Sequence, residues 1–206
     1  MYLAMGFRPD LAYALQQLSQ LLHNPGLAHW RAAKRALHYL RGTSNLGLML
    51  GDQDYVSKPF LSAYVDANYA ILILWLSKKQ GIVTLSTTEA EFVDLALCIQ
   101  EFLYVRQLAA ELHNTSDQPI SVYEDNQSTI SIAQNTEHHG RSKTIDVRFM
   151  FVRDLVENSE FILHNCSTKE QRADFFTKAH PEPVFRRFCL ALRLYALGDY
   201  LCGRVP

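Results

Sequence analysis

The chain has 206 residues, of which 48% are hydrophobic and 20% charged, and this composition is typical of a globular protein and excludes an intrinsically disordered one. No apolar run has the length that crosses a bilayer, and the first residues lack the basic and apolar regions of a secretion signal. The four cysteines show no CxxC spacing. We therefore expect an intracellular, non-secreted protein without membrane contact, in which the thiols are free and no zinc site forms.

The net charge of -1 hides an asymmetry along the chain. Residues 1–50 contain five basic residues and one acidic residue, so they carry +4 and the remainder carries -5. A basic front and an acidic back fit a nucleic-acid-binding segment joined to a metal-binding carboxylate site. A solvated pair of helices would carry the same charge, and charge alone favours that simpler interpretation.

Two helices are predicted at the front of the chain. Pro9 suits the first position of a helix over residues 9–23, and Asn24-Pro25-Gly26 ends it. One face of this helix carries Leu11, Leu15, Leu18 and Leu22. A second helix follows to Arg41, with Gly42 as its stop signal. The pair predicts an N-terminal helical hairpin.

The second helix has an apolar stripe and a basic side. The apolar stripe consists of Trp30, Ala33, Leu37 and Leu40. The basic side chains recur at spacings of three and four, and they are Arg31, Lys34, Arg35, His38 and Arg41. This side could lie along a phosphate backbone. It could equally be the solvated side of an amphipathic helix.

A polar, turn-rich connection over residues 51–59 marks a boundary, after which a strand is predicted over residues 60–67. Alternation places Ala63 and Val65 on one face of this strand, and Tyr64 and Asp66 on the other. Two further β-prone runs, 71–76 and 82–85, are separated by a polar segment. Strands are also expected over 120–123 and 160–166, and a helix over 145–156.

Cap signals predict where three helices begin. Ser86 followed by Glu89 is a capping box that opens a long helix, with Glu91 in its second turn. Asp125-Asn126 caps a helix that runs to about residue 135. The segment Ser167-Thr168-Lys169-Glu170 forms a second capping box, and the helix that it opens is expected to carry Asp174. The order of strands and helices indicates an α/β domain with a mixed sheet.

Four acidic residues lie at the strand ends and in the helices that flank them, and they are Asp66, Glu91, Asp125 and Asp174. Carboxylates brought to one sheet edge in this way can hold two divalent cations, and such a pair can hydrolyse a phosphodiester. Each residue has a simpler interpretation when it is taken singly. Aspartate is common in turns at strand ends, and an exposed helix position accepts any carboxylate.

The chain contains, in this order, YVDANYA, LSKKQGIVTLSTTEAEFVDLA, VYEDNQSTISIAQN, GRSKTIDVRFMFVRDLV and STKEQRADFFTK. These segments resemble the ribonuclease H domain of copia-type retrotransposon Pol polyproteins. The front of the chain, YLAMGFRPDLAYALQQLSQ and NPGLAHWRAAKRALHYLRGT, resembles the end of the reverse transcriptase region of the same polyproteins. The resemblance divides the chain into residues 1–58 (reverse transcriptase end), 59–180 (ribonuclease H-like) and 181–206 (C-terminal helical tail).

The resemblance implies a ribonuclease H-like mixed sheet flanked by helices. It implies hydrolysis of the RNA strand of RNA–DNA hybrids during reverse transcription, with two Mg²⁺ ions and with Mn²⁺ as the alternative. The catalytic and metal-binding residues then fall on Asp66, Glu91, Asp125 and Asp174. The expected nucleic-acid-binding residues are Arg31, Lys34, Arg35 and Arg41. The expected partners are an RNA–DNA hybrid and the remainder of a Pol polyprotein.

The sequence departs from the family pattern at three places. A turn and a strand's worth of residues is missing after Asp66, so either Ile71–Leu76 takes the second-strand position or the sheet edge is incomplete. A catalytically inactive remnant with at most weak nucleic-acid binding is therefore the alternative function. Glu124 replaces an apolar residue and should point to the strand face opposite Asp125. Asp94 replaces an alanine near the sheet-facing side of its helix, where a buried charge is expected.

Overall fold

The computed structural model of the chain describes residues 2–49, 62–65, 70–71, 84, 86–112, 118–135 and 143–198. These residues form a mixed α/β structure in two compact units. The terminal unit consists of residues 1–53 and 175–206, and the sheet unit consists of residues 54–174. None of the helices within the described ranges is long and apolar enough to cross a membrane.

The sheet unit is built on four strands in the order β3-β2-β4-β5. Their bounds are Ser62–Val65 for β2, Ala70–Ile71 for β3, Ile120–Glu124 for β4 and Phe161–Asn165 for β5. Strands β2, β4 and β5 are parallel, and β3 is antiparallel to β2. Val65, Glu124 and Asn165 lie side by side in the register, so the three parallel strands end together at one edge of the sheet. The mixed sheet is confirmed.

The short connection after β2 is long enough for a reversal of the chain. Tyr64 pairs with Ala70, so only residues 65–69 separate the two paired positions. Ala70–Ile71 therefore lies beside β2, so Ile71, the one described residue of the run Ile71–Leu76, is in the second-strand position. Asp66, residues 72–76 and most of the predicted strand 82–85 lie outside the described residues.

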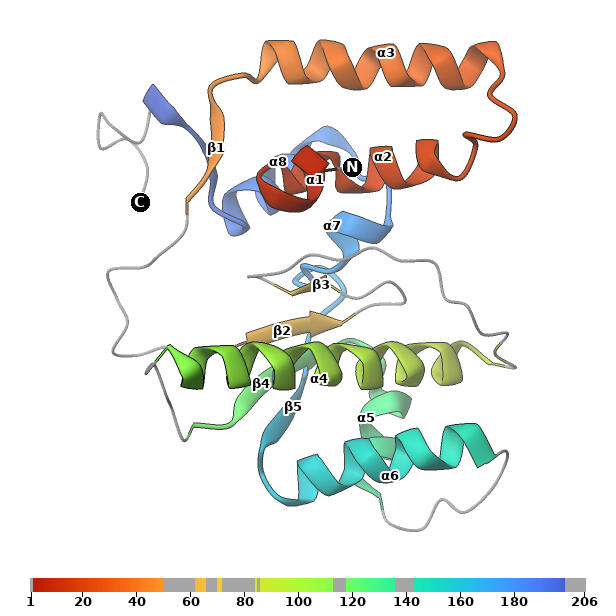
Figure 1. Cartoon of the computed structure of the whole chain (residues 1–206), viewed down its shortest axis with the longest axis vertical. Helices are drawn as coiled ribbons and strands as arrows, with labels where there is room; N and C mark the ends of the chain where they lie inside the picture. The colour runs from red at the N-terminus through yellow and green to blue at the C-terminus, as the bar shows by residue number, and fades with distance from the viewer. Residues whose placement is uncertain are drawn as a thin grey trace. The chain divides into compact units, whose positions relative to one another are not determined.

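Three helices pack against one face of this sheet (Figure 1). They are α4 (Thr87–Glu111), α5 (Gln127–Gln134) and α6 (Lys143–Glu157). The sheet contributes Ala63, Val65, Val122 and Leu163 to the shared core. In the helices, Phe92 of α4 stacks on Phe149 of α6 with ring centroids 4.0 Å apart. The alternation of buried and half-buried residues in β2 follows the predicted pattern.

Two predicted helix starts are confirmed and the third is wrong. The Ser86 hydroxyl accepts the Glu89 amide at 3.1 Å, and the Asn126 side chain accepts the amides that open α5. Ser167, in contrast, accepts the Lys169 amide at 3.3 Å with its hydroxyl and the Glu170 amide at 2.7 Å with its carbonyl. These bonds close tight turns in place of a helix. Gln171, which follows the turns, is fully buried, and the helix α7 (Asp174–Thr177) begins only at Asp174.

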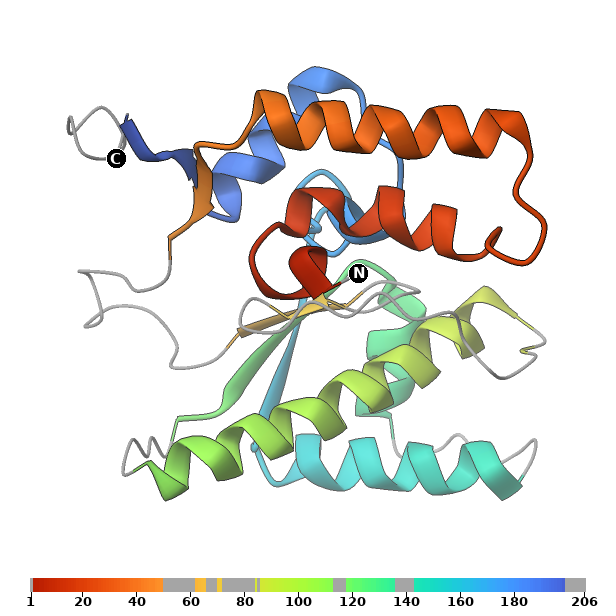
Figure 2. The ribbon, with the colours of Figure 1, turned by 45° about the horizontal axis from the view of Figure 1, so that its top comes forward.

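The terminal unit joins the two ends of the chain. Its elements are α1 (Tyr2–Gly6), η1 (Pro9–Leu11), α2 (Ala12–Ser19), α3 (Leu27–Gly42), β1 (Leu46–Leu48), α8 (Glu182–Ala191) and β6 (Leu194–Ala196). Helices α2 and α3 form the predicted hairpin (Figure 2), although α2 ends at Ser19 and not at residue 23. Strands β1 and β6 pair antiparallel, from Leu46 with Ala196 to Leu48 with Leu194. This pairing was not predicted.

The apolar stripe of α3 is not buried along its whole length. Trp30 is 60% exposed and Leu37 is 63% exposed, and no residue of α3 is fully buried. Ala33 and Leu40 are half-buried. The C-terminal part of α3 contacts α8 through Tyr39, whose ring lies edge-on to Phe185 with centroids 6.2 Å apart.

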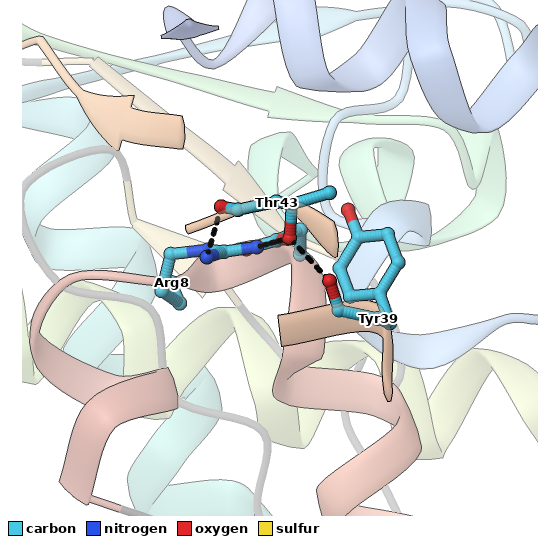
Figure 3. Close-up of polar contacts among 4 residues, drawn as sticks. Arg8, Tyr39 and Thr43 are labelled. Carbon is cyan, nitrogen blue, oxygen red and sulfur yellow. Dashed lines mark hydrogen bonds and ion pairs between the residues drawn. The ribbon is translucent and has the colours of Figure 1, made fainter. Parts of the chain in front are cut away.

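A buried ion pair holds the beginning of the terminal unit to the end of α3. Arg8 donates two hydrogen bonds to the Asp10 carboxylate, at 2.9 and 2.7 Å, and both side chains are almost fully buried. Arg8 also donates to the carbonyl and the hydroxyl of Thr43, and that hydroxyl donates to the carbonyl of Tyr39 (Figure 3). The bonds to Asp10 raise the pKa of Arg8, so the buried guanidinium stays charged.

We expect Asp10→Asn to destabilise the chain by about 3 kcal/mol, because the substitution leaves a buried guanidinium without its counter-charge. Chemical denaturation followed by circular dichroism would measure the change in the free energy of unfolding. Glu182→Gln is the matched control, since it removes an ion pair to Arg186 whose side chains are 76% and 73% exposed. The control should cost no more than about 0.5 kcal/mol. Equal effects of the two substitutions would contradict the assignment.

Candidate metal centre

The structure describes three of the four predicted carboxylate residues. Asp125 directly follows β4 and is half-buried, and Glu91, in the second turn of α4, is also half-buried. Asp174 is the first residue of α7 and is only 4% exposed. Asp66 is the next residue in the chain after Val65, the last residue of β2, and lies outside the described residues.

Glu91 and Asp125 belong to segments that meet near the beginnings of their helices. The Thr129 hydroxyl in the first turn of α5 lies 3.5 Å from the Thr88 carbonyl in the first turn of α4. Glu91 follows Thr88 by three residues, and Asp125 precedes the Asn126 cap of α5. The two helix starts are therefore neighbours at the edge where the parallel strands end.

Asp125 and Asp174 both act on one thiol. Cys166 directly follows β5, and its amide donates to the Glu124 carbonyl at 3.0 Å, which extends the pairing of β4 with β5. Burial and, after it, the negative charges of Asp125, Glu124 and Asp174 together raise the pKa of the Cys166 thiol to about 12. Two of the predicted ligands, from different elements, therefore lie within electrostatic reach of the same atom.

The chemistry of these side chains fits a hard divalent cation. Among the described residues, no group of three or more His, Cys, Asp or Glu is arranged to hold a metal ion. Mg²⁺, however, usually binds one or two carboxylates and completes its coordination with water and substrate phosphates. Asp125 and Asp174 supply oxygen donors of that kind, and Asp66 lies outside the described residues.

The comparisons with known proteins agree on the origin of the chain. It is 36% identical over 203 residues to the retrovirus-related Pol polyprotein from transposon TNT 1-94 of Nicotiana tabacum, a match that covers 90% of this chain. It is 35% identical over 199 residues to the retrovirus-related Pol polyprotein from transposon RE2 of Arabidopsis thaliana, covering 88% of this chain. The chain belongs to the copia-type, retrovirus-related Pol polyproteins of transposons.

The match to the Pol polyproteins covers most of this chain but only a small part of their length. The chain spans 15% of the length of the tobacco Pol polyprotein and 14% of the Arabidopsis one. A secreted RxLR effector protein (number 161) of Plasmopara viticola is 37% identical over 120 residues, which is 51% of this chain and 84% of the effector. No family model and no solved structure matches the chain.

Two carboxylates of this Pol segment, Glu124 and Asp94, are fully buried. Glu124 is 0% exposed and Asp94 is 1% exposed, and the Asn126 amide donates to the Glu124 carboxylate at 3.0 Å. Burial raises the pKa of the Cys98 thiol, and Glu124, Glu101 and Asp94 raise it further. Glu124 thus acts on the core thiol of α4 as well as on Cys166, and the predicted burial of Asp94 is confirmed.

Helix α3 of the Pol segment presents the predicted basic side chains to solvent. The exposed residues include all four candidates for nucleic-acid binding, Arg31, Lys34, Arg35 and Arg41. The helix contains no acidic residue. The Lys34 ammonium lies 5.5 Å from the centre of the exposed Trp30 ring. This surface combines positive charge with an accessible aromatic side chain.

We expect Asp125→Asn to lower the pKa of the Cys166 thiol, because it removes a negative charge that disfavours the thiolate. The pH profile of Cys166 alkylation, read by mass spectrometry of the modified peptide, should move to lower pH. Glu101→Gln is the control, since Glu101 acts on Cys98 and not on Cys166. A Cys166 profile that is the same in Asp125→Asn and the wild type would contradict the closeness of the two side chains.

Proposed function

We propose that this Pol segment is a metal-dependent ribonuclease H that hydrolyses the RNA strand of RNA–DNA hybrids, joined to the end of a reverse transcriptase region. The observation that carries the proposal is the register of the parallel strands β2, β4 and β5, which end together at Val65, Glu124 and Asn165. The sequence places Asp66 and Asp125 directly after the first two of these residues, and carboxylates at one sheet edge can hold divalent cations. Similarity to Pol polyproteins over 90% of the chain supports the same proposal.

The topology of the sheet unit supports a ribonuclease H-like fold as part of the proposal. Three parallel strands, with an antiparallel strand next to the first of them, form the order β3-β2-β4-β5. Helices α4, α5 and α6 pack on one face of these strands. This is the mixed, helix-flanked sheet that the sequence resemblance implies.

The residues that would hold the cations are Asp66, Glu91, Asp125 and Asp174. When bound, a pair of Mg²⁺ ions, or Mn²⁺ as the alternative, supplies an activated water and neutralises charge on the leaving oxygen. The protein's own contribution is to orient the carboxylates. Asp174 is held by the turns that precede it, and Asp125 by its place between β4 and the Asn126 cap. The half-buried Glu91 is fixed by the long helix α4.

The basic surface of α3 would bind the hybrid through its phosphates. Four exposed cationic residues without an acidic neighbour on the helix form a positive strip along it, and Trp30 offers a face for stacking. The remaining parts of a Pol polyprotein are the second partner that we propose, because the chain spans 15% of the tobacco relative.

The second candidate function is an inactive remnant that binds nucleic acid at most weakly. The connection after β2 favours it, since the reversal between Tyr64 and Ala70 is short and Asp66 falls within it. A displaced Asp66 would leave the other carboxylates without the ligand expected on the first parallel strand.

An assay of hybrid cleavage with Mg²⁺ separates the two candidate functions. We expect the wild type to release RNA fragments and Asp125→Asn to be slower by at least about 100-fold, because loss of a ligand should exceed the loss seen for outer-sphere groups. Asp154→Asn is the control, an exposed carboxylate of α6 whose removal should leave the rate unchanged. Wild-type cleavage no faster than that of Asp125→Asn would leave the remnant as the answer.

The α3 surface predicts binding that weakens with salt. Each phosphate contact contributes roughly one unit to the slope of log affinity against log salt, so replacing Arg31, Lys34, Arg35 and Arg41 by alanine should reduce the slope by up to about 4. Fluorescence anisotropy with a labelled hybrid, without divalent cations so that no cleavage occurs, measures this slope. Arg186→Ala is the control on α8. Salt-independent binding by the wild type would refute the assignment.

A further inference from the structure

The side chain of Gln171 joins the end of β2 to the segment that carries Asp174. Gln171 is fully buried, at 0% exposure, in the turns between β5 and α7. Its amide nitrogen donates to the Val65 carbonyl at 2.6 Å, and its amide oxygen accepts the Ala173 amide at 3.4 Å. Both ends of one neutral side chain are therefore used.

The two bonds act on the backbone next to two predicted metal ligands. The Val65 carbonyl carbon is covalently bonded to the amide nitrogen of Asp66, so the bond from Gln171 fixes the peptide group that leads into Asp66. On the other side, Asp174 follows Ala173 directly, and its amide donates to the Gln171 carbonyl at 3.3 Å. One residue thus sets the relation between the chain before Asp66 and the chain before Asp174.

The other contacts of this segment do not fix the position of Asp174 relative to the end of β2. Ser167 accepts the amides of Glu170 and Gln171 with its carbonyl, and these bonds shape the turn within the segment itself. Arg172 lies over the Tyr64 ring at 5.0 Å, which ties the segment to β2 through a contact that tolerates sliding. The hydrogen bond from the Gln171 amide is directional and short, and its acceptor is the carbonyl of the last residue of β2.

A glutamine suits this position physically. The amide both donates and accepts while carrying no charge, so it adds nothing to the negative potential around Cys166. A buried carbonyl such as that of Val65 would lose a bonding partner if the side chain were apolar. A carboxylate in the same place could not donate to that carbonyl and would add to the repulsion within the site.

We propose that Gln171 is a positioning residue that fixes the segment before Asp174 to the end of β2, and so sets the affinity of the carboxylate site for a divalent cation. The inference rests on the proposed function for the identity of that site. Groups that orient metal ligands without binding the metal typically change affinity or activity by about 10- to 100-fold when they are replaced. Gln171 does not touch the cation or the substrate in this proposal.

The test measures Mn²⁺ binding to the full chain by electron paramagnetic resonance of the free ion, well below the melting temperature of each variant. We expect Gln171→Leu, which keeps the size and removes both bonds, to weaken Mn²⁺ binding by at least about 10-fold. Gln171→Asn keeps the amide on a shorter side chain and should fall between Gln171→Leu and the wild type. It also covers the case in which Gln171→Leu does not fold.

Two controls separate positioning from general stability. Val152→Ala removes buried volume from the core of the sheet unit and should lower the melting temperature without changing Mn²⁺ affinity. Ser167→Ala alters the same turn segment while leaving the Gln171 amide in place, and it should bind Mn²⁺ like the wild type. If Gln171→Leu and Gln171→Asn behave like Val152→Ala, losing stability at unchanged affinity, the proposal is overturned.

Parallel measurement of hybrid cleavage distinguishes this proposal from the proposed function. Cleavage by the wild type with unchanged Mn²⁺ affinity in the Gln171 variants would remove the positioning role and leave the ribonuclease function. Mn²⁺ binding that depends on Gln171, without hybrid cleavage by the wild type, would support the positioning role and contradict the ribonuclease function. A wild-type chain that binds no Mn²⁺ would overturn the positioning role outright.

Discussion

The parallel pairing of β2, β4 and β5 is the constraint on which the candidate site depends. Because Val65, Glu124 and Asn165 are in register, the residues that follow them leave the sheet at the same edge. The sequence places Asp66, Asp125 and Cys166 directly after these three. A shift of one strand by a single residue would exchange its two faces and separate the acidic side chains. The catalytic proposal is therefore a consequence of strand register before it is one of individual side chains.

This edge carries a carboxylate in addition to the predicted metal ligands, because Glu124 directly precedes Asp125. Glu124 is buried at 0% exposure next to Asp125 and contributes to the raised pKa of both Cys98 and Cys166. A buried carboxylate needs partners in the protein, and the Asn126 amide is one of them. The same amide belongs to the residue that caps α5. Local helix capping and the accommodation of the additional charge are thus connected through one residue.

Local signals in the sequence predicted local structure well, and they failed where distant contacts decide the outcome. The caps at Ser86 and Asn126 and the alternation in β2 depend on neighbouring residues, and all three were predicted. Ser167 has the same local pattern as Ser86, yet no helix begins there. The segment instead bends so that the Gln171 side chain donates a hydrogen bond to the distant Val65 carbonyl. The pairing of β1 with β6 joins three-residue strands from opposite ends of the chain, and such short strands carry no detectable periodicity.

The pairing of β2 with β3 and the hydrogen bond from Gln171 both act near the end of β2. Tyr64 is held by β4 on one side and by Ala70 on the other, and Val65 pairs with Glu124 of β4. The Val65 carbonyl is then held by Gln171. The described bonds therefore fix the chain up to the peptide group that leads into Asp66, from β4 and β3 through the strand pairing and from the Asp174 segment through Gln171.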